Sequence, residues 1–427
     1  MATLSRMIKC LDLCMKLTAL AAILFLPTMY SYAQKLATLE INLDRTSAGL
    51  EIPVQVMLDP ITHLPDSSLS LLEIQGKEKI PVVFQLEGGP HRKLTWLVDD
   101  KLKTRVYELV KARPAAANPP SLKTVKDFGA ITIQAENKNL LRYHSQPVYP
   151  PKGIDPVFKR SAFIHPLWSP HGQELTRIHA PDHYHHFGLW NPWTHVLFEG
   201  DTVDFWNLKS KQGTVRFADF ISTTNGNIFA EFSALQEHVA FKEGKEKVAL
   251  QEVQTVRIYA PRNNSDYYIA DITAQLNCPG SPVRLLEYRY GGMGWRATEQ
   301  WTKENSKVLS SEGKTRKDAD GSKARWCIVQ GTVDGENAGA VMMSYPANYN
   351  HPEPLRIWPE NANRNRGDMF ANFSPTKDMD WPLEPGKNYI LKYRFVVFNG
   401  EFTKEKAEAA WYYFASPPMV TVKKNAN

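Results

Sequence analysis

Histidine and tryptophan are concentrated in one short part of this chain, residues 163–206. Seven of the twelve histidines lie there, together with four tryptophans and several carboxylates. Imidazole suits proton transfer and metal binding near neutral pH, and tryptophan offers a flat apolar surface with one hydrogen-bond donor. The segment therefore indicates a polar and aromatic pocket for a sugar, a metal ion, or both. Its histidines are His165, His171, His179, His183, His185, His186 and His195.

The densest group of histidines is the run Asp182-His183-Tyr184-His185-His186. If this run is a strand, His183 and His185 share one face, while Tyr184 and His186 lie on the other. Such a pair can bind a metal ion with a third ligand from elsewhere, hold a polar substrate, transfer protons, or only organise a loop. No HExxH or two-Cys-two-His pattern is present, so we assign no metal ligand, and a bound metal is an alternative rather than the expectation.

A second candidate segment is Phe163 to Trp168, FIHPLW, which reads as a strand that runs into a proline. Because Pro166 has no backbone donor, we expect this strand at an edge or ending there. His165 and Trp168 would then lie near a rim, where ligands bind. The alternative is a buried His165 that is bonded to a carbonyl.

Asp204-Phe205-Trp206 alternates polar and aromatic residues. As a strand, it would place Asp204 and Trp206 on one face, and a carboxylate beside an indole is well suited to hold sugar hydroxyls. The alternative is a solvated aspartate and a core tryptophan.

The run 287–296, EYRYGGMGWR, reads as an alternating strand that leads into a glycine-rich turn. Glu287 and Arg289 would share a face, and Trp295 with Arg296 would extend a binding surface. The glycines allow close approach of a ligand, although the spacing does not match a dinucleotide-binding fingerprint. The alternative is a bulged hairpin with an exposed arginine.

A long polar loop region follows at residues 345–352 and 358–368. Ordering so many asparagines and arginines is costly unless they bind something. Arg364 and Arg366 would pair with a carboxylate or sulfate of the substrate, and the alternative is a solvated loop.

These observations define two sets of candidate site residues. The catalytic candidates, a histidine as acid or base and a carboxylate that orients it or takes the opposite proton role, are His165, His185, His186, Asp204 and Glu287. The substrate-binding candidates are Trp168, His183, Trp190, Trp206, Arg289, Trp295, Arg296, Arg364 and Arg366.

Residues 1–33 have the pattern of a secretory signal peptide. Three basic residues precede an apolar run at 17–29, and Ser-Tyr-Ala precedes Gln34 as a cleavage site. The apolar run is short for a membrane span, although an uncleaved anchor is the alternative. We therefore expect export to the periplasm or the exterior. The signal carries three basic residues and Asp12, a net of +2, so its removal lowers the net charge from +6 to about +4.

The remaining chain excludes several classes of protein. It has no basic run with interleaved aromatics, so a nucleic-acid partner is not expected, and it has no apolar run long enough for a stable span. Cys10 and Cys14 leave with the signal. Cys278 and Cys327 form either one disulfide or two buried thiols.

Short strand patterns and turn residues dominate the rest of the chain. We expect strands at residues 52–58, 80–84, 131–134, 253–259, 267–272 and 389–397, and one helix at 403–414 capped by Thr403. Residues 34–112 form a small N-terminal β domain, 113–124 a linker, and 125–427 a large antiparallel β-sandwich that contains the histidine-rich segment.

Several of these motifs together resemble the DUF6807 family, often labelled "methane oxygenase PmoA". The resembling pieces are FIHPLWSPHG, DHYHHFGLW, VDFW, EYRYGGMGW, residues 310–331, and SYPANYNHP. The family block usually reads HPHHRGLW, so Tyr184 and Phe187 depart from it, and the latter departure implies altered specificity. The resemblance implies a β-supersandwich like that of galactose-mutarotase-like proteins and a role beside polysaccharide degradation. Methane monooxygenase subunits span membranes with several helices, which this chain lacks after residue 33.

The sequence therefore favours an exported carbohydrate-active enzyme, a hydrolase or a lyase, acting on a poly- or oligosaccharide in a tryptophan-lined pocket. A non-catalytic glycan-binding protein is one alternative, because the same aromatic residues would serve it. A metal-dependent oxygenase, as the family label suggests, is another. The cofactor is unknown.

Overall fold

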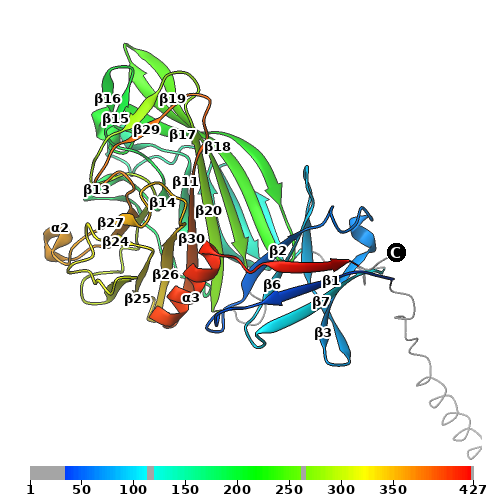
Figure 1. The fold of residues 1–427 in the computed structure, drawn as a ribbon. Coiled ribbons are helices and arrows are strands. Elements are labelled where there is room, and N and C mark those ends of the chain that lie inside the picture. The colour runs from blue at the N-terminus through cyan, green and yellow to red at the C-terminus, as the bar shows by residue number, and fades with distance from the viewer. Residues whose placement is uncertain (1–33, 113–119, 261–265, 425–427) are drawn as a thin grey trace, which may run out of the picture.

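The structure, a computed structural model, describes residues 34–112, 120–260 and 266–424. The predicted signal peptide at 1–33 and residues 113–119 of the predicted linker lie outside the described residues. Strands dominate the described chain and all of the larger sheets are antiparallel, which confirms the mainly-β prediction. Figure 1 shows the two parts of the fold, with the N-terminal sheets at one end.

The N-terminal part is a small β-sandwich. One sheet has the order β31 (Val420–Lys424), β1 (Gln34–Asn42), β7 (Thr104–Lys111), β3 (Leu69–Gln75) and β4 (Glu78–Val82). The other has the order β2 (Ile52–Met57), β6 (Lys93–Val98) and β5 (Phe84–Glu87). Alternate residues of both sheets meet in one apolar core, where Leu39 and Leu109 pack with Val54 and Trp96.

The large part is a sandwich of two long antiparallel sheets. The first has the order β24 (Lys323–Ala324), β27 (Glu353–Ile357), β28 (Phe370–Phe373), β22 (Gly294–Arg296), β14 (Leu189–Trp190), β11 (Phe163–Leu167), β10 (Lys138–His144), β9 (Ala130–Ala135) and β8 (Leu122–Lys126). The second has the order β17 (Gly213–Thr224), β18 (Phe229–Lys242), β19 (Lys245–Tyr259), β20 (Tyr267–Asn277), β30 (Tyr389–Asn399), β26 (Glu336–Ser344), β25 (Trp326–Val333) and β23 (Ser306–Ser310).

The two long sheets share one apolar core. Ile131 and Leu141 of the first sheet belong to the same buried cluster as Val256 and Phe395 of the second. Strands of the second sheet alternate buried and less buried residues, as in β19 and β20, because one face meets the core and the other does not. Cys278 and Cys327 are both buried free thiols. Of the two predicted alternatives, the structure therefore shows two thiols and not a disulfide.

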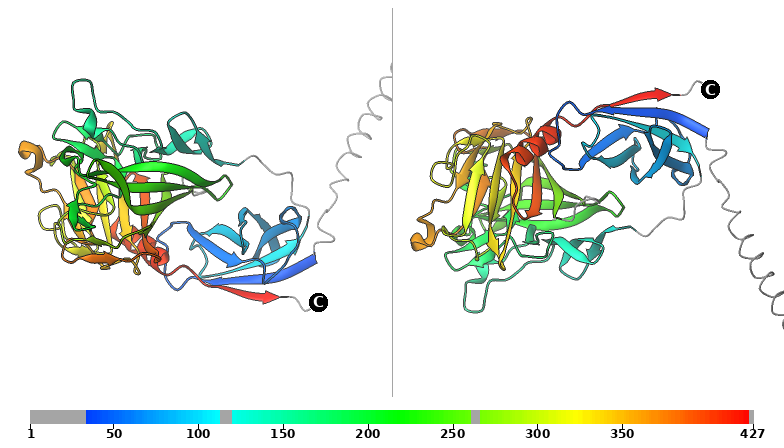
Figure 2. Two further views of the ribbon diagram at one scale, coloured as in Figure 1. Left: turned by 90° about the horizontal axis from the view of Figure 1, so that it is seen from above. Right: turned by 90° about the horizontal axis from the view of Figure 1, so that it is seen from below.

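The C-terminal segment connects the two sandwiches. Helix α3 (Lys404–Ala415) packs Ala407 and Phe414 against the second long sheet, and β31 then pairs with β1 of the N-terminal sheet. Figure 2 shows this crossing from both sides. Gln85 of the N-terminal part accepts hydrogen bonds from the backbone of Ile228 and Phe229. The last strand therefore belongs to the sheet formed by the first residues, whereas we assigned all of 125–427 to the large domain.

Most predicted elements are present, and the differences have local causes. Thr403 caps α3 by accepting from the backbone of Lys406, as predicted. The predicted strand at 80–84 is divided between β4 and β5, because the chain crosses from one N-terminal sheet to the other at Val83. Strand β8 begins at Leu122, inside the predicted linker.

Several small elements lie at the end of the large sandwich away from the N-terminal sheets (Figure 1). They are β12 (Ile178–Ala180) paired with β13 (His183–Phe187), a sheet of β16 (Asp201–Val203), β15 (Val196–Phe198), β21 (Val283–Leu285) and β29 (Trp381–Leu383), and the single turn α2 (Ala362–Asn365). Within the described residues there are also three 3-10 turns, at Asp66–Ser68, Pro156–Phe158 and Leu208–Ser210.

Candidate active site

Three histidines of β13 gather their rings in one place. The rings of His183 and His186 are stacked, with their centroids 4.7 Å apart. The ring centroid of His185 lies 5.3 Å from that of His183 and 4.9 Å from that of His186. The predicted alternation, with His186 on the opposite face from His183, is therefore wrong. Ala180 of β12 pairs with His183, and Ile178 pairs with Phe187, so a step of two residues along β12 is matched by a step of four residues along β13. Strand β13 therefore bulges, and its side chains no longer alternate strictly between the two faces.

His183 forms a pair with the carboxylate next to it in sequence. Its Nδ1 lies 2.8 Å from Oδ2 of Asp182. Arg296 reaches the same carboxylate from β22, with Nη2 at 2.9 Å from both Asp182 oxygens. The Arg296 side chain is 1 % exposed, whereas that of His183 is 38 % exposed. A buried cation thus anchors a carboxylate that holds a solvent-accessible imidazole.

The charge state of Asp182 determines the tautomer of His183. Burial raises the pKa of Asp182, but the hydrogen bond from His183 and the charge of Arg296 outweigh it and hold that pKa well below its ordinary value. An ionised carboxylate only accepts hydrogen bonds, so Nδ1 of His183 carries a proton. In the neutral ring the lone pair is then on Nε2, which can accept a proton from a substrate.

Arg296 is shared between two acidic residues. Its Nη2 also donates to Oδ2 of Asp368 at 2.6 Å, and Asp368 is 3 % exposed. Arg177 lies 3.7 Å from the same Asp368 oxygen, and Arg366 donates to the other at 2.5 Å. A buried charge is tolerated when it is paired and hydrogen-bonded. The two carboxylates pair with Arg296 through Nη2, whereas its Nη1 is buried without a hydrogen-bond partner among the described residues. Asp182 and Asp368 were not among the predicted site residues, because the Arg296 that joins them is distant from both in sequence.

The other two histidines of β13 are less accessible than His183. Burial is the largest cause that lowers the pKa of His185, to about 4, and it lowers the pKa of the fully buried His186 as well. Both rings are therefore neutral near pH 7. Nδ1 of His186 is buried without a hydrogen-bond partner among the described residues. These two predicted acid–base candidates thus lie beneath and beside His183, which we had assigned to substrate binding.

Aromatic rings form the base on which the histidines rest. The rings of Trp190, Trp206 and Phe370 surround His186 at centroid distances of 5.3, 6.1 and 5.2 Å. Trp358, which precedes α2, lies 4.8 Å from His183. Trp190 is 1 % exposed and Trp206 is 3 % exposed. The two predicted stacking residues are thus close to the histidines, but they have little surface left for a sugar.

Phe187, where the sequence departs from the HPHHRGLW pattern, is also buried. Its ring packs at 4.9 Å from that of Phe163 and 4.8 Å from that of His179. The guanidinium of the buried Arg160 lies 5.8 Å from the Phe187 ring. The departure therefore changes packing under the site and not an exposed contact.

His165, Trp168 and Trp295 lie outside this cluster. Nδ1 of His165 is 2.9 Å from the hydroxyl of Thr176, and burial lowers the pKa of His165 to about 4. Strand β11 lies inside the first long sheet, between β14 and β10, so the predicted edge position is wrong. The alternative, a strand that ends near Pro166, agrees with the end of β11 at Leu167. Pro166 lies where the register between β11 and β10 shifts. The backbone N–H that proline lacks is therefore not needed for pairing at this position. Trp295 is fully buried in the main core, and its indole donates to the backbone of Leu175.

Asp204 and Glu287 do not orient any of these histidines. Strand β16 ends at Val203, and Asp204 instead closes a turn by accepting from the backbone of Trp206 and Asn207, at 2.8 Å each. The predicted strand through 204–206 is therefore wrong. Strand β21 likewise ends at Leu285, and Glu287 is exposed.

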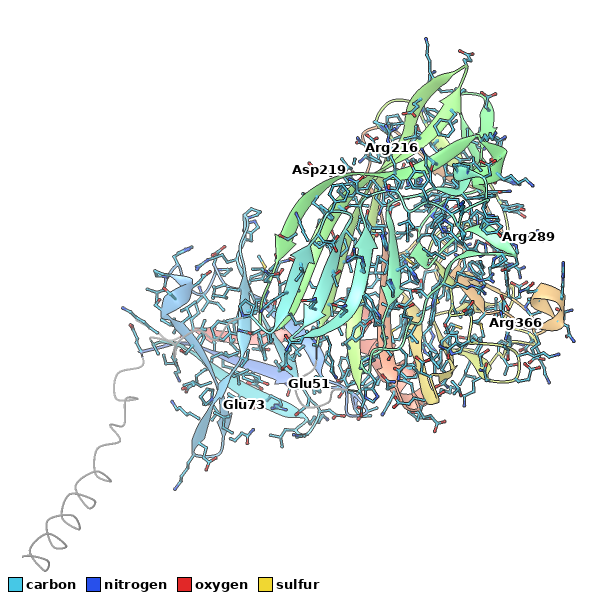
Figure 3. The ribbon with its side chains drawn as sticks, turned by 180° about the vertical axis from the view of Figure 1, so that it is seen from behind. Glu51, Glu73, Arg216, Asp219, Arg289 and Arg366 are labelled. Carbon is cyan, nitrogen blue, oxygen red and sulfur yellow. The ribbon has the colours of Figure 1, made fainter. Side chains whose placement is uncertain are left out.

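The remaining arginine candidates lie near the same end of the molecule (Figure 3). Arg289 is exposed, and its guanidinium lies 5.4 Å from the ring of Tyr290. Arg366 bonds Asp368 and the backbone carbonyl of Glu299. Arg364 is exposed in α2, with a left-handed backbone at φ 56°. Arg289 and Arg364 are both exposed without an acidic partner among the described residues, and Arg289 is the one in contact with the ring of Tyr290.

The three clustered imidazoles do not form a metal site. Nδ1 of His183 is committed to Asp182, and the rings of His183 and His186 stack face to face at 24°, so their in-plane lone pairs do not converge on one point. Within residues 34–112, 120–260 and 266–424, no group of three or more histidine, cysteine or acidic side chains is arranged to hold a metal ion. Nor does any helix of these residues have the length and apolar character needed to cross a membrane.

A family of unknown function, DUF6807, matches residues 130–412 of the chain. The chain belongs to this family. The DUF6807 match runs from β9 to α3, so it includes Asp182, His183, Arg296 and Asp368. The description of DUF6807 assigns no activity, and no curated protein matches the chain.

Three solved structures are similar to this DUF6807 chain. An α-mannosidase from Enterococcus faecalis V583 is 7 % identical with a TM-score of 0.44, covering 91 % of this chain and 46 % of that one. Heparan sulfate lyase HepC from Pedobacter heparinus is 11 % identical with a TM-score of 0.32, covering 68 % and 38 %. A glycosyl hydrolase family 38 protein from Enterococcus faecalis is 8 % identical with a TM-score of 0.41, covering 93 % and 48 %. The chain spans about half or less of the length of these proteins.

Proposed function

We propose that this protein is an exported carbohydrate-active enzyme, a hydrolase or a lyase, in which His183 is the general acid and base. The observation that carries the proposal is the Asp182–His183 pair, with Nδ1 held at 2.8 Å and the imidazole 38 % exposed. A carboxylate that fixes the tautomer of a histidine and stabilises its protonated form is a recurrent arrangement for proton transfer. Such a group contributes roughly 10²- to 10⁴-fold to a rate.

A sugar suits the surroundings of His183 better than an apolar ligand does. Its neighbours include the Asp182 carboxylate and the ring of Trp358, and Tyr184 and Tyr290 are both partly exposed. Amphipathic rings beside polar groups match the apolar faces and hydroxyls of a pyranose. The predicted signal peptide at residues 1–33 supports an exported location, and a mature N-terminus at Gln34 would test it.

The accessible groups favour a lyase over a hydrolase. Most glycoside hydrolases place two carboxyl groups on either side of the scissile bond. Here the nearest two carboxylates, Asp182 and Asp368, both bind the one Nη2 atom of Arg296, and Asp368 is 3 % exposed. The exposed carboxylate at the edge of this network, Glu299, is paired with Arg177, and His183 is the exposed imidazole that the network holds. In an elimination, Nε2 takes a proton from carbon, the C–H electron pair forms a double bond, and the C–O bond on the next carbon breaks. The leaving oxygen then takes the proton from the His183 imidazolium, which returns the ring to its neutral form.

Turnover of a polysaccharide panel tests the proposal. Wild-type protein, His183→Gln and the control His171→Gln would be incubated with neutral and acidic polysaccharides. New reducing ends report any cleavage, and absorbance near 235 nm reports the conjugated double bond that a lyase forms. His171 is a comparable partly exposed histidine, but it pairs with Glu336 far from β13. We expect cleavage that His183→Gln abolishes and His171→Gln retains. Binding without any product would instead support a glycan-binding protein.

A further inference from the structure

Tyr290 is in contact with two cationic side chains. The guanidinium carbon of Arg289 lies 5.4 Å from its ring centroid, and that of Arg356 lies 5.1 Å from it. Arg356 also donates from Nη2 to the Tyr290 hydroxyl at 3.2 Å. Cations near an aromatic face are stabilised by the ring. This ring therefore helps to hold two positive charges close together.

The positive charge here exceeds the negative charge. Arg356 and Lys377 share one carboxylate, Asp320, at 2.8 and 3.2 Å. Arg289 has no ion pair or hydrogen bond with any other described side chain, and only the rings of Tyr288 and Tyr290 contact its guanidinium. Two nearby acids are used elsewhere, since Asp378 pairs with Lys323 and Asp380 with Arg284. Glu287, two residues before Arg289, is exposed and forms no ion pair with these cations. Of the three cations, two share Asp320, and Arg289 is the exposed member of the group.

One indole separates this cationic group from the proposed base. Nε1 of Trp358 donates to the Tyr290 hydroxyl at 3.1 Å, while the ring of Trp358 lies 4.8 Å from that of His183. Tyr290 also contacts Trp206 at 5.5 Å. The cations and His183 therefore border the same aromatic cluster.

We propose that Arg289, supported by Arg356 and Lys377, forms an anion subsite that selects an acidic sugar, by binding its carboxylate or sulfate oxygens. This inference rests on the proposed carbohydrate activity and names its substrate class. A guanidinium donates two parallel hydrogen bonds to a carboxylate or sulfate, which gives both affinity and orientation. Neutralisation of a bound carboxylate by the guanidinium would also make the proton on the neighbouring carbon easier to remove, which an elimination at His183 requires.

Calorimetry with matched probes tests the subsite. The carboxylate probes are oligogalacturonate, oligoalginate and hyaluronan oligosaccharides, each compared with its carboxyl-reduced neutral form. Oligosaccharides of κ-carrageenan supply sulfate without carboxylate. The proteins are wild type, Arg289→Gln, and Arg216→Gln, which removes an equal charge from β17 outside the cluster (Figure 3).

We expect wild type to bind at least one acidic probe more than tenfold tighter than a neutral one, with affinity falling as salt rises. Arg289→Gln would lose that difference, and Arg216→Gln would keep it. Equal binding of acidic and neutral forms, no binding of any acidic probe, or an unchanged Arg289→Gln would overturn the inference. If wild type cleaves a neutral polysaccharide and His183→Gln does not, the proposed function holds even when the anion subsite fails its test. If acidic probes bind through Arg289 but wild type cleaves none of the polysaccharides, the subsite holds and the proposed function fails.

Discussion

Arg296 donates from one nitrogen to both carboxylate oxygens of Asp182, at 2.9 Å each, although the two residues are 114 positions apart. That contact joins β22 to the start of β13 and fixes the carboxylate that holds His183. Because Arg296 is almost fully buried, the contact is both a structural support and the base of the candidate catalytic pair. Replacing either residue should therefore affect stability and activity to different degrees.

Replacement of Asp182 by asparagine should strongly reduce the turnover of the folded protein. The amide can donate to Nδ1 of His183 and so favour the tautomer with a proton on Nε2, which cannot act as a base. By analogy with such replacements in other histidine–carboxylate pairs, we expect kcat to fall by roughly 10²- to 10⁴-fold. The double variant with His183→Gln should be no worse than His183→Gln alone, since residues that act as a unit are not additive. If the losses of turnover in the two single variants add up in the double variant, Asp182 does not act through His183.

Replacement of Arg296 by methionine should destabilise the protein strongly. It leaves Asp182 and Asp368 without their shared cation, and removing one partner of a buried ion pair costs about 3–5 kcal/mol. Arg296→Lys keeps the charge but loses the forked geometry, so we expect a smaller loss. Urea unfolding measures both, with Arg216→Gln as an exposed control expected to cost about 1 kcal/mol or less. An Arg296→Met protein as stable as wild type would refute the role of this network.

Stability should fall as the pH falls from about 6.5 to about 4. Burial, the largest cause, lowers the pKa of His165 and of His185 to about 4 in the folded protein, against about 6.5 for an exposed histidine. The unfolded chain binds these protons first, so the folded state loses stability through this window, by about 3 kcal/mol per residue at pH 4. Thermal unfolding at several pH values should show a shallower slope for His165→Asn with His185→Asn. An unchanged slope would contradict the assignment.

Gly188, directly after β13, should tolerate no side chain. Its φ is +56°, and a Cβ there would lie 2.2 Å from the carbonyl oxygen of Ile164. Gly76 has a similar φ of +64° with no atom within 4 Å of such a Cβ. We expect Gly76→Ala to cost about 1–2 kcal/mol, from the backbone conformation alone, and Gly188→Ala to cost clearly more because strand β11 must move. Equal losses in chemical unfolding would mean that the close approach to Ile164 is not limiting.

The fold could be predicted from local sequence patterns to a large extent. Alternation and turn residues located strands such as β19 and β30, and the cap at Thr403 located α3, because these signals act over a few residues. The pairing of β31 with β1 could not be predicted this way, since it joins the two ends of the described chain. Nor did alternation predict where β16 and β21 end, since the turn at Asp204 depends on its bonds to the backbone.

The structure brings together several histidines of the predicted segment, but not with the faces that the sequence predicts. The histidines of β13 do gather with Trp190 and Trp206, but the bulge moves His186 to the side of His183. Trp358 reaches His183 from a loop that sequence spacing cannot bring near it. The adjacent pair Asp182-His183 was the one local signal, and the buried Arg296 that gives it meaning comes from a distant strand.

Product formation by wild type and His183→Gln on one cleavable polysaccharide tests the central claim most directly. Both proteins would be matched for folding by their unfolding transitions, and cleavage would be followed by reducing ends and absorbance near 235 nm. The account predicts that wild type forms product and that His183→Gln is at least about 100-fold slower, as expected for loss of a general base. A folded His183→Gln protein with wild-type turnover would contradict it.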